Sequence, residues 1–123
     1  MPRTIQQRDS MTAEIKRLVS VTVAAGDLDR YSGKRRFVRS AAPIPLEATR
    51  DPTGAGSTWA MSMHNISLAG IAAWSHEPLT LGDLFYVRDV STAEIRPWLS
   101  CEVRHCTAGL RGHLIGSRFI VPD

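Results

Sequence analysis

Along residues 41–123, apolar and polar positions alternate in short segments that turn residues interrupt. An alternation of period two is typical of strands that bury one face, and short links between such segments are typical of antiparallel sheets. No long helical period occurs in this part of the chain. The pattern predicts an all-β, six-stranded antiparallel barrel with strands at 42–48, 58–66, 71–75, 83–90, 94–105 and 112–121.

Two of these segments show the alternation most clearly. In the segment 58–66, Trp59, Met61 and Met63 share one face, while Ser62 and His64 share the other. The segment 94–105 is expected to be wet on one side and to have an edge or a bulge near its proline. Its expected inner residues are Ile95, Leu99, Cys101 and Val103, and its expected outer residues are Arg96, Ser100, Glu102 and Arg104.

The N-terminal part of the chain follows a different pattern. Ile15, Leu18 and Val19 recur near helical spacing, Ser10 or Thr12 can cap a helix, and Gly26 can end it. The β-branched residues of the run 19–23 argue against a helix. We predict a helix over 10–25, frayed residues 1–9 and a polar connector 26–33. The expected organisation is an N-terminal arm, 1–32, helical or flexible, followed by a barrel domain, 33–123.

Positive charge is concentrated in the same N-terminal part. Residues 1–40 carry nine Lys or Arg against four Asp or Glu, whereas residues 41–123 carry six against eight. The densest stretch is Gly33-Lys34-Arg35-Arg36-Phe37-Val38-Arg39-Ser40, with four cations in six positions. Such a run predicts an anionic partner, and a solvated basic loop is the alternative.

The sequence lacks the residue patterns that several kinds of function require. Cys101 and Cys106 fit neither a redox pair nor a zinc pair, and the four histidines lack metal-ligand spacing, so we expect no metal and a reduced Cys101 in the core. The sequence shows no nucleophile beside a base and no carboxylate pair, so it does not suggest an enzyme. No apolar run approaches the roughly 20 residues of a membrane helix, and the N-terminus lacks the apolar core of a secretory signal. We therefore expect a cytoplasmic protein without membrane insertion.

A second polar stretch follows the strand predicted at 58–66. It reads Asn65-Ile66-Ser67-Leu68-Ala69-Gly70, and its residue types suit a tight turn. An Asn amide, a Ser hydroxyl and exposed backbone N–H groups can also bind a base edge and a phosphate. The basic stretch could approach the same ligand, because guanidinium chelates phosphate through two donors and stacks on flat rings.

Taken in order, these stretches resemble the two signatures of the PilZ domain family of bacterial cyclic di-GMP receptors. RxxxR is matched by residues 35–39, [D/N]xSxxG by residues 65–70, and the family's closing iGxxF segment by residues 115–119. The resemblance implies a six-stranded barrel that binds cyclic di-GMP at its rim, with no other cofactor. It implies that Arg35 and Arg39 contact phosphates and guanines, and that Asn65, Ser67 and Gly70 hold a guanine and a nearby phosphate.

The resemblance also suggests further ligand contacts. Lys34, as a long cation before the RxxxR segment, favours a stacked pair of dinucleotides over a single one. Arg30 and Arg36 could stack on a base, Trp74 could cover one, and Gly116 could let a base lie flat. Surface charge for the arginines, a core or half-buried position for Trp74 and close packing for Gly116 are the alternatives. Asn65 replaces the more frequent Asp and loses its charge-assisted acceptor, which lowers the expected affinity.

The function implied is that of a bacterial receptor that binds cyclic di-GMP and signals to an unidentified downstream protein by ordering its N-terminal arm. A PilZ-fold adaptor that binds no nucleotide is the first alternative. A nucleic-acid-binding barrel is less favoured, because residues 41–123 are net negative and carry no basic, aromatic stripe.

Overall fold

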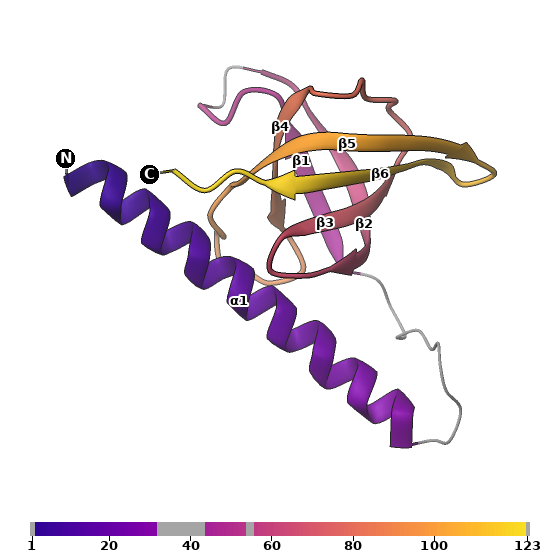
Figure 1. The fold of residues 1–123 in the computed structure, drawn as a ribbon, viewed down its shortest axis with the longest axis horizontal. Helices are drawn as coiled ribbons and strands as arrows, with labels where there is room; N and C mark the ends of the chain where they lie inside the picture. The colour runs from indigo at the N-terminus through magenta and orange to yellow at the C-terminus, as the bar shows by residue number, and fades with distance from the viewer. Residues whose placement is uncertain (1, 32–43, 54–55, 123) are drawn as a thin grey trace.

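The computed structural model describes residues 2–31, 44–53 and 56–122, and the helix side chains from Arg8 to Thr22. Within these ranges lie one long helix and six strands, which Figure 1 shows as a barrel with the helix across one end. The elements are α1 (Pro2–Tyr31), β1 (Pro45–Thr49), β2 (Thr58–Ile66), β3 (Gly70–Ser75), β4 (Leu84–Asp89), β5 (Leu99–Gly109) and β6 (Gly112–Phe119).

The six strands close into an antiparallel barrel in the order β1-β2-β3-β6-β5-β4. The predicted all-β barrel is therefore confirmed. Alternate residues of each strand fill its interior, among them Met61, Met63 and Cys101, as their spacing predicted. The other buried hydrophobic residues of the strands are Leu46, Ala48, Ile71, Ala73, Phe85, Val87, Leu99, Val103, Ile115 and Phe119.

The expected strand bounds are right for β2 and need correction elsewhere. β1 begins at Pro45 rather than at residue 42, and β5 runs from Leu99 to Gly109 rather than over 94–105. The prediction that Ile95 points inward is wrong, because its side chain is 88% exposed in the loop before β5. Pro97 lies in that loop; it has no N–H to donate to a strand ladder, which explains the late start of β5.

The helix is longer than its sequence pattern predicts. It begins at Pro2 and continues through Gly26 to Tyr31, so the predictions of fraying over residues 2–9, of a stop at Gly26 and of a connector over residues 26–31 are wrong. A glycine inside a helix costs only about 1 kcal/mol relative to alanine, too little to end a helix that its neighbours support. Proline is readily accommodated in a first helical turn. In the described part of the chain, no helix is long and apolar enough to cross a membrane.

One face of α1 closes the barrel at one end. Met11, Ile15 and Leu18 are buried within the same hydrophobic core as the strand residues, and Val19 packs against it. This face is the one that the helical spacing predicted. We call the covered end the helix end; the turn between β2 and β3 lies at this end, as do the last residue of β4 and the first of β5. A 30-residue helix is about 45 Å long, so α1 extends beyond the barrel (Figure 1).

Candidate functional site

The turn between β2 and β3 contains the predicted residues Asn65, Ser67 and Gly70. The Ser67 N–H donates to the Gly70 carbonyl at 2.9 Å, and the Ala69 N–H donates to Ser67 Oγ at 3.1 Å. The Phe119 N–H donates to the Ala69 carbonyl at 2.9 Å and fastens the turn to the end of β6. Asn65 and Ser67 are exposed. The turn is thus internally fixed and presents an amide and a hydroxyl to solvent.

The close approach of β3 and β6 explains why residue 70 is a glycine. A Cβ at this position would lie 2.1 Å from the carbonyl oxygen of Ser117, on the neighbouring strand β6. Because that oxygen belongs to the backbone, any side chain at residue 70 would push β3 and β6 apart. The fold requires this glycine whether or not a ligand binds.

Four residues form one row across four strands, which we call the site row. Asn65 of β2 pairs with Ala72 of β3, Ala72 pairs with Gly116 of β6, and Gly116 pairs with His105 of β5. The register shifts at two places, between Met63 and Asn65 and between Val103 and His105. Bulges of this kind redirect side chains and are frequent beside functional sites. Here they leave Asn65 and His105 exposed although Met63 and Val103 are buried.

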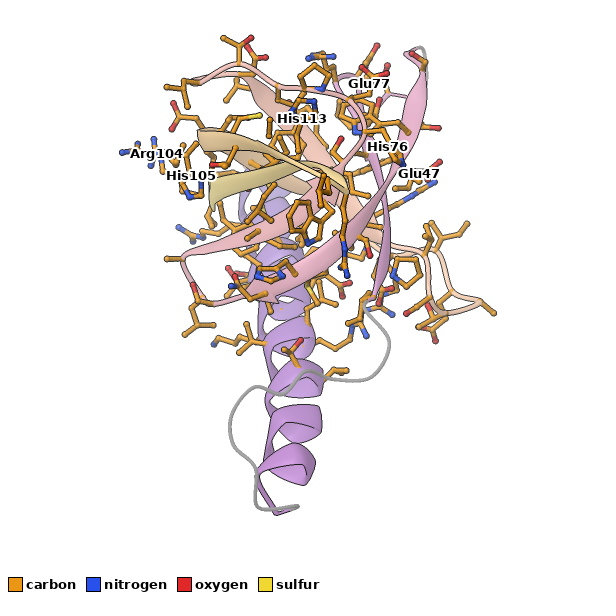
Figure 2. All side chains as sticks on the ribbon, turned by 90° about the vertical axis from the view of Figure 1, so that its right-hand side faces the viewer. Glu47, His76, Glu77, Arg104, His105 and His113 are labelled. Atoms are coloured by element: carbon orange, nitrogen blue, oxygen red, sulfur yellow. The ribbon has the colours of Figure 1, made fainter. Side chains whose placement is uncertain are left out.

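His105 lies directly over Gly116. A Cβ on Gly116 would lie 2.2 Å from two atoms of the imidazole, so the ring occupies the space that a side chain would need. Figure 2 shows His105 and Arg104 projecting from the barrel on the side away from Glu47. The site row therefore has two small residues at its centre, an amide at one end and an aromatic ring at the other. This arrangement suits a flat, polar-edged group.

Trp74 lies beside the site row on the outer surface. It follows Ala72 by two residues in β3, it is half-buried, and its ring meets that of His64 edge-on, with 6.1 Å between centroids. A shallow cavity of about 300 Å³ adjoins it, lined in part by Ser62, His76 and Arg111. Trp74 is therefore a half-buried aromatic residue that borders this open cavity.

A buried ion cluster holds α1 at the helix end. The Glu14 carboxylate, 1% exposed, accepts hydrogen bonds from Arg17 at 2.8 and 2.9 Å and from Arg96 at 2.6 and 3.3 Å. Arg17 also donates to Asp89, the last residue of β4, at 2.6 Å. Burial alone would raise the pKa of Glu14, but the hydrogen bonds and charges of the two arginines outweigh it and lower that pKa. For Asp89, burial again opposes a lowered pKa that Ser91 and Arg17 produce.

Comparison with known families identifies the fold. The family model of the PilZ domain matches residues 33–123. The chain belongs to the PilZ domain family. PilZ domains are generally non-catalytic receptors of cyclic di-GMP. Among the described residues, no group of three or more His, Cys, Asp or Glu side chains could hold a metal ion. Comparisons with curated proteins and with solved structures found no match.

The site residues predicted from the PilZ signatures divide into two sets. Asn65, Ser67 and Gly70 lie at the turn at the helix end; Gly116 pairs with Ala72 beneath the His105 ring, and Trp74 follows two residues after Ala72 in β3. The basic residues Lys34, Arg35, Arg36 and Arg39 lie outside the described residues, as does the side chain of Arg30 near the end of α1. The chain re-enters at Ile44, whose carbonyl accepts the Met63 N–H at 2.9 Å, at the same end of the barrel.

Sequence reasoning missed His105, and it placed Arg118 only as an unnamed position in the closing PilZ segment. Arg118 pairs with Gly70 across β3 and β6, and it lies two residues from Gly116. A signal for His105 was present in the sequence. Since Gly109 pairs with Gly112 at the β5–β6 turn, counting back along the hairpin pairs His105 with Gly116. The outward direction of His105 depends on the bulge, which the sequence does not announce.

Proposed function

We propose that this PilZ domain is a non-catalytic receptor that binds cyclic di-GMP over the site row, next to the helix end. The observation that carries the proposal is the register that aligns Asn65, Ala72, Gly116 and His105 on one outer face. A guanine can lie over Ala72, against the His105 ring that covers Gly116. The Asn65 amide offers both a donor and an acceptor to the edge of the base, and exposed Ser67 lies close enough in sequence to take part.

The cations before β1 complete the proposed site. Lys34, Arg35, Arg36 and Arg39 lie in the segment that joins the end of α1 to Ile44 at the helix end. Arg35 and Arg39 bind the phosphates and guanines, and Lys34 favours a stacked pair of dinucleotides. Four neighbouring cations repel one another, and the two phosphates of each dinucleotide relieve that repulsion. Arg30, Arg36 and Trp74 supply further contacts to the bases.

Signalling in this proposal uses the connection between the basic segment and α1. Lys34 follows Tyr31, the last helical residue, by only three positions. Drawing the basic segment onto the site row therefore changes the forces on a helix that the Glu14 cluster holds in place. A displaced α1 alters the surface offered to a downstream protein. The ligand's binding energy would be divided between closing the basic segment and moving the helix.

Isothermal titration with cyclic di-GMP tests the binding, with GTP and cyclic AMP as comparison ligands. We expect micromolar or tighter binding that Arg35→Ala plus Arg39→Ala abolishes. The double variant Arg8→Ala plus Lys16→Ala removes the same charge from exposed positions of α1 and should bind as the wild type does. Undiminished binding by the Arg35, Arg39 variant would refute the site. No binding by the wild type at millimolar ligand would favour the adaptor function.

Hydrogen exchange tests the signalling step separately. On saturation with cyclic di-GMP, exchange in residues 32–43 should slow, and the protection of residues 11–22 should change because α1 moves. Unchanged exchange in both segments, at a ligand concentration that saturates the titration, would leave a receptor without the proposed movement.

A further inference from the structure

Arg118 is a cation of β6 that lies close to the site row. It projects from β6 next to Gly70 of β3, and the same strand carries Gly116 two residues earlier. Its side chain is 55% exposed and forms an ion pair with Glu102 of β5. The proposed ligand surface is therefore bordered on its β6 side by a guanidinium that already pairs with an anion.

Glu102 serves two cations at once. Its Oε1 pairs with Arg118 Nε, and Arg104 Nη1 approaches the same oxygen at 4.0 Å. Two guanidiniums and one carboxylate leave this part of the surface with a net positive charge. Exposed ion pairs contribute little to stability, so an anion with better geometry can draw Arg118 away from Glu102.

Reach and chemistry both favour a phosphate as that anion. Neighbouring strands are about 4.8 Å apart, which an extended arginine side chain spans easily, so Arg118 can turn from β5 towards Gly70 without movement of the backbone. Guanidinium binds phosphate through two parallel hydrogen bonds, whereas Glu102 engages Arg118 through the single Nε contact. The turn at Ser67–Gly70 has no side chain large enough at Gly70 to block this approach.

We propose that Arg118 binds a phosphate of the cyclic dinucleotide and that Glu102 is the internal anion with which this phosphate competes. The inference rests on the proposed function and extends it, because it adds a cation contributed by the barrel itself to those of the basic segment. Arg104 adds long-range attraction on the same side. Glu102 therefore lowers the affinity for the ligand, while Arg118 raises it.

Two substitutions with opposite expected effects test this assignment by titration with cyclic di-GMP. Arg118→Ala should weaken binding about tenfold, the effect of losing one charge-assisted contact. Glu102→Gln should strengthen binding about two- to fivefold, because it frees Arg118 and removes a negative charge beside the phosphate. Arg118→Lys should recover only part of the loss, because an ammonium cannot bind a phosphate in the planar two-donor mode.

The chain contains a matched control pair on another wall of the barrel. Arg88 of β4 pairs with Glu47 of β1 at 2.7 Å, and both side chains are half-buried. Figure 2 shows Glu47 on the side of the barrel away from Arg104 and His105. Glu47→Gln changes the net charge by the same amount as Glu102→Gln does, and Arg88→Ala removes the same charge as Arg118→Ala. Neither control should change the affinity, and thermal melting of each variant verifies its folding.

The possible outcomes separate this inference from the function on which it rests. Equal strengthening by Glu47→Gln and Glu102→Gln would mean that net charge alone acts, and would overturn the assignment. Wild-type binding that Arg118→Ala leaves unchanged would overturn the role of Arg118 and leave the receptor function standing. A wild-type chain that does not bind would overturn both. Opposite shifts at Arg118 and Glu102, with silent controls, would establish the contact.

Discussion

Replacing Glu14 with glutamine should weaken the attachment of α1 to the barrel. The substitution keeps the size of the side chain but removes the charge that four hydrogen bonds from Arg17 and Arg96 surround. The two guanidiniums then face each other with less compensation, since Asp89 and Glu94 are the remaining carboxylates that the structure pairs with them. We expect a folded variant whose helix is held mainly by Met11, Ile15 and Leu18.

The exposure of the three groups sets the size of the effect. Breaking a fully buried ion pair costs about 3–5 kcal/mol, and an exposed pair is worth about 0–1 kcal/mol. Glu14 is 1% exposed, but Arg17 and Arg96 are 30% and 20% exposed and stay partly hydrated. The unfolding free energy should therefore fall by about 2 kcal/mol, between the two limits. For a chain of this size, that corresponds to a fall in Tm of roughly 6–10 °C.

Thermal and urea unfolding of the variant, followed by circular dichroism, measure this loss. A double-mutant cycle with Arg96→Ala isolates the pair, and the cycle of Glu47→Gln with Arg88→Ala provides a comparison on the barrel wall. The reasoning predicts a larger coupling energy for the pair at the helix end. A coupling below about 0.5 kcal/mol would refute it, because such a value is typical of solvated pairs.

Acid should remove the stabilisation that the Glu14 carboxylate gives to the fold. Because the folded-state pKa of Glu14 is lowered, its stabilising effect is complete above the unfolded-state pKa, about 4.3, and is lost as the pH falls through the folded value. Asp89 changes in the same direction. The difference in stability between the wild type and the Glu14→Gln variant should thus be greatest near pH 7 and shrink below about pH 4. An equal difference at pH 3 and pH 7 would contradict the assignment.

Three further predictions follow from burial and packing. Gly70→Ala should lower the free energy of unfolding by about 1–3 kcal/mol because the new Cβ meets backbone, whereas at Gly116→Ala it meets an exposed imidazole that can turn aside, so the loss should be smaller. Urea unfolding of both variants measures the two losses, and equal losses would contradict the distinction. Leu18→Ala, at a fully buried position of α1, should cost about 2–5 kcal/mol by the same measurement, and a loss below 1 kcal/mol would mean that α1 is not packed on the core. Burial raises the pKa of Cys101 to about 12, so an alkylating reagent at neutral pH should modify half-buried Cys106 first and reach Cys101 only on unfolding. Mass spectrometry detects the order of modification, and early modification of Cys101 would show that the barrel opens.

The sequence predicts those parts of the fold that depend on local periodicity. The period-two pattern of Trp59, Met61 and Met63 places β2 correctly, and the helical spacing of Ile15 and Leu18 identifies the face of α1 that packs on the barrel. The ends of α1 could not be predicted from this spacing, because the helix continues beyond the apolar face that the spacing marks and through Gly26, whose helical cost is small.

The sequence likewise predicts some residues of the candidate site and misses others. Asn65, Ser67 and Gly70 form a contiguous motif, so sequence alone finds them. His105 was missed because the alternation that puts Cys101 and Val103 inside also predicts an inward residue 105. The bulge after Val103 reverses that direction, and a bulge depends on the pairing of β5 with β6 rather than on any one residue.

The hydrophobic core of this protein extends beyond the region that the PilZ family model matches. The PilZ family match begins at residue 33, but Met11, Ile15 and Leu18 belong to the hydrophobic core of the barrel. A fragment cut at the family boundary would leave an apolar surface open to water at the helix end, and Arg96 would lose Glu14 and keep its pairing with Glu94. In the proposed signalling, a partner that displaces α1 would have to cover the same apolar surface, and the helix would compete with that partner for the end of the barrel.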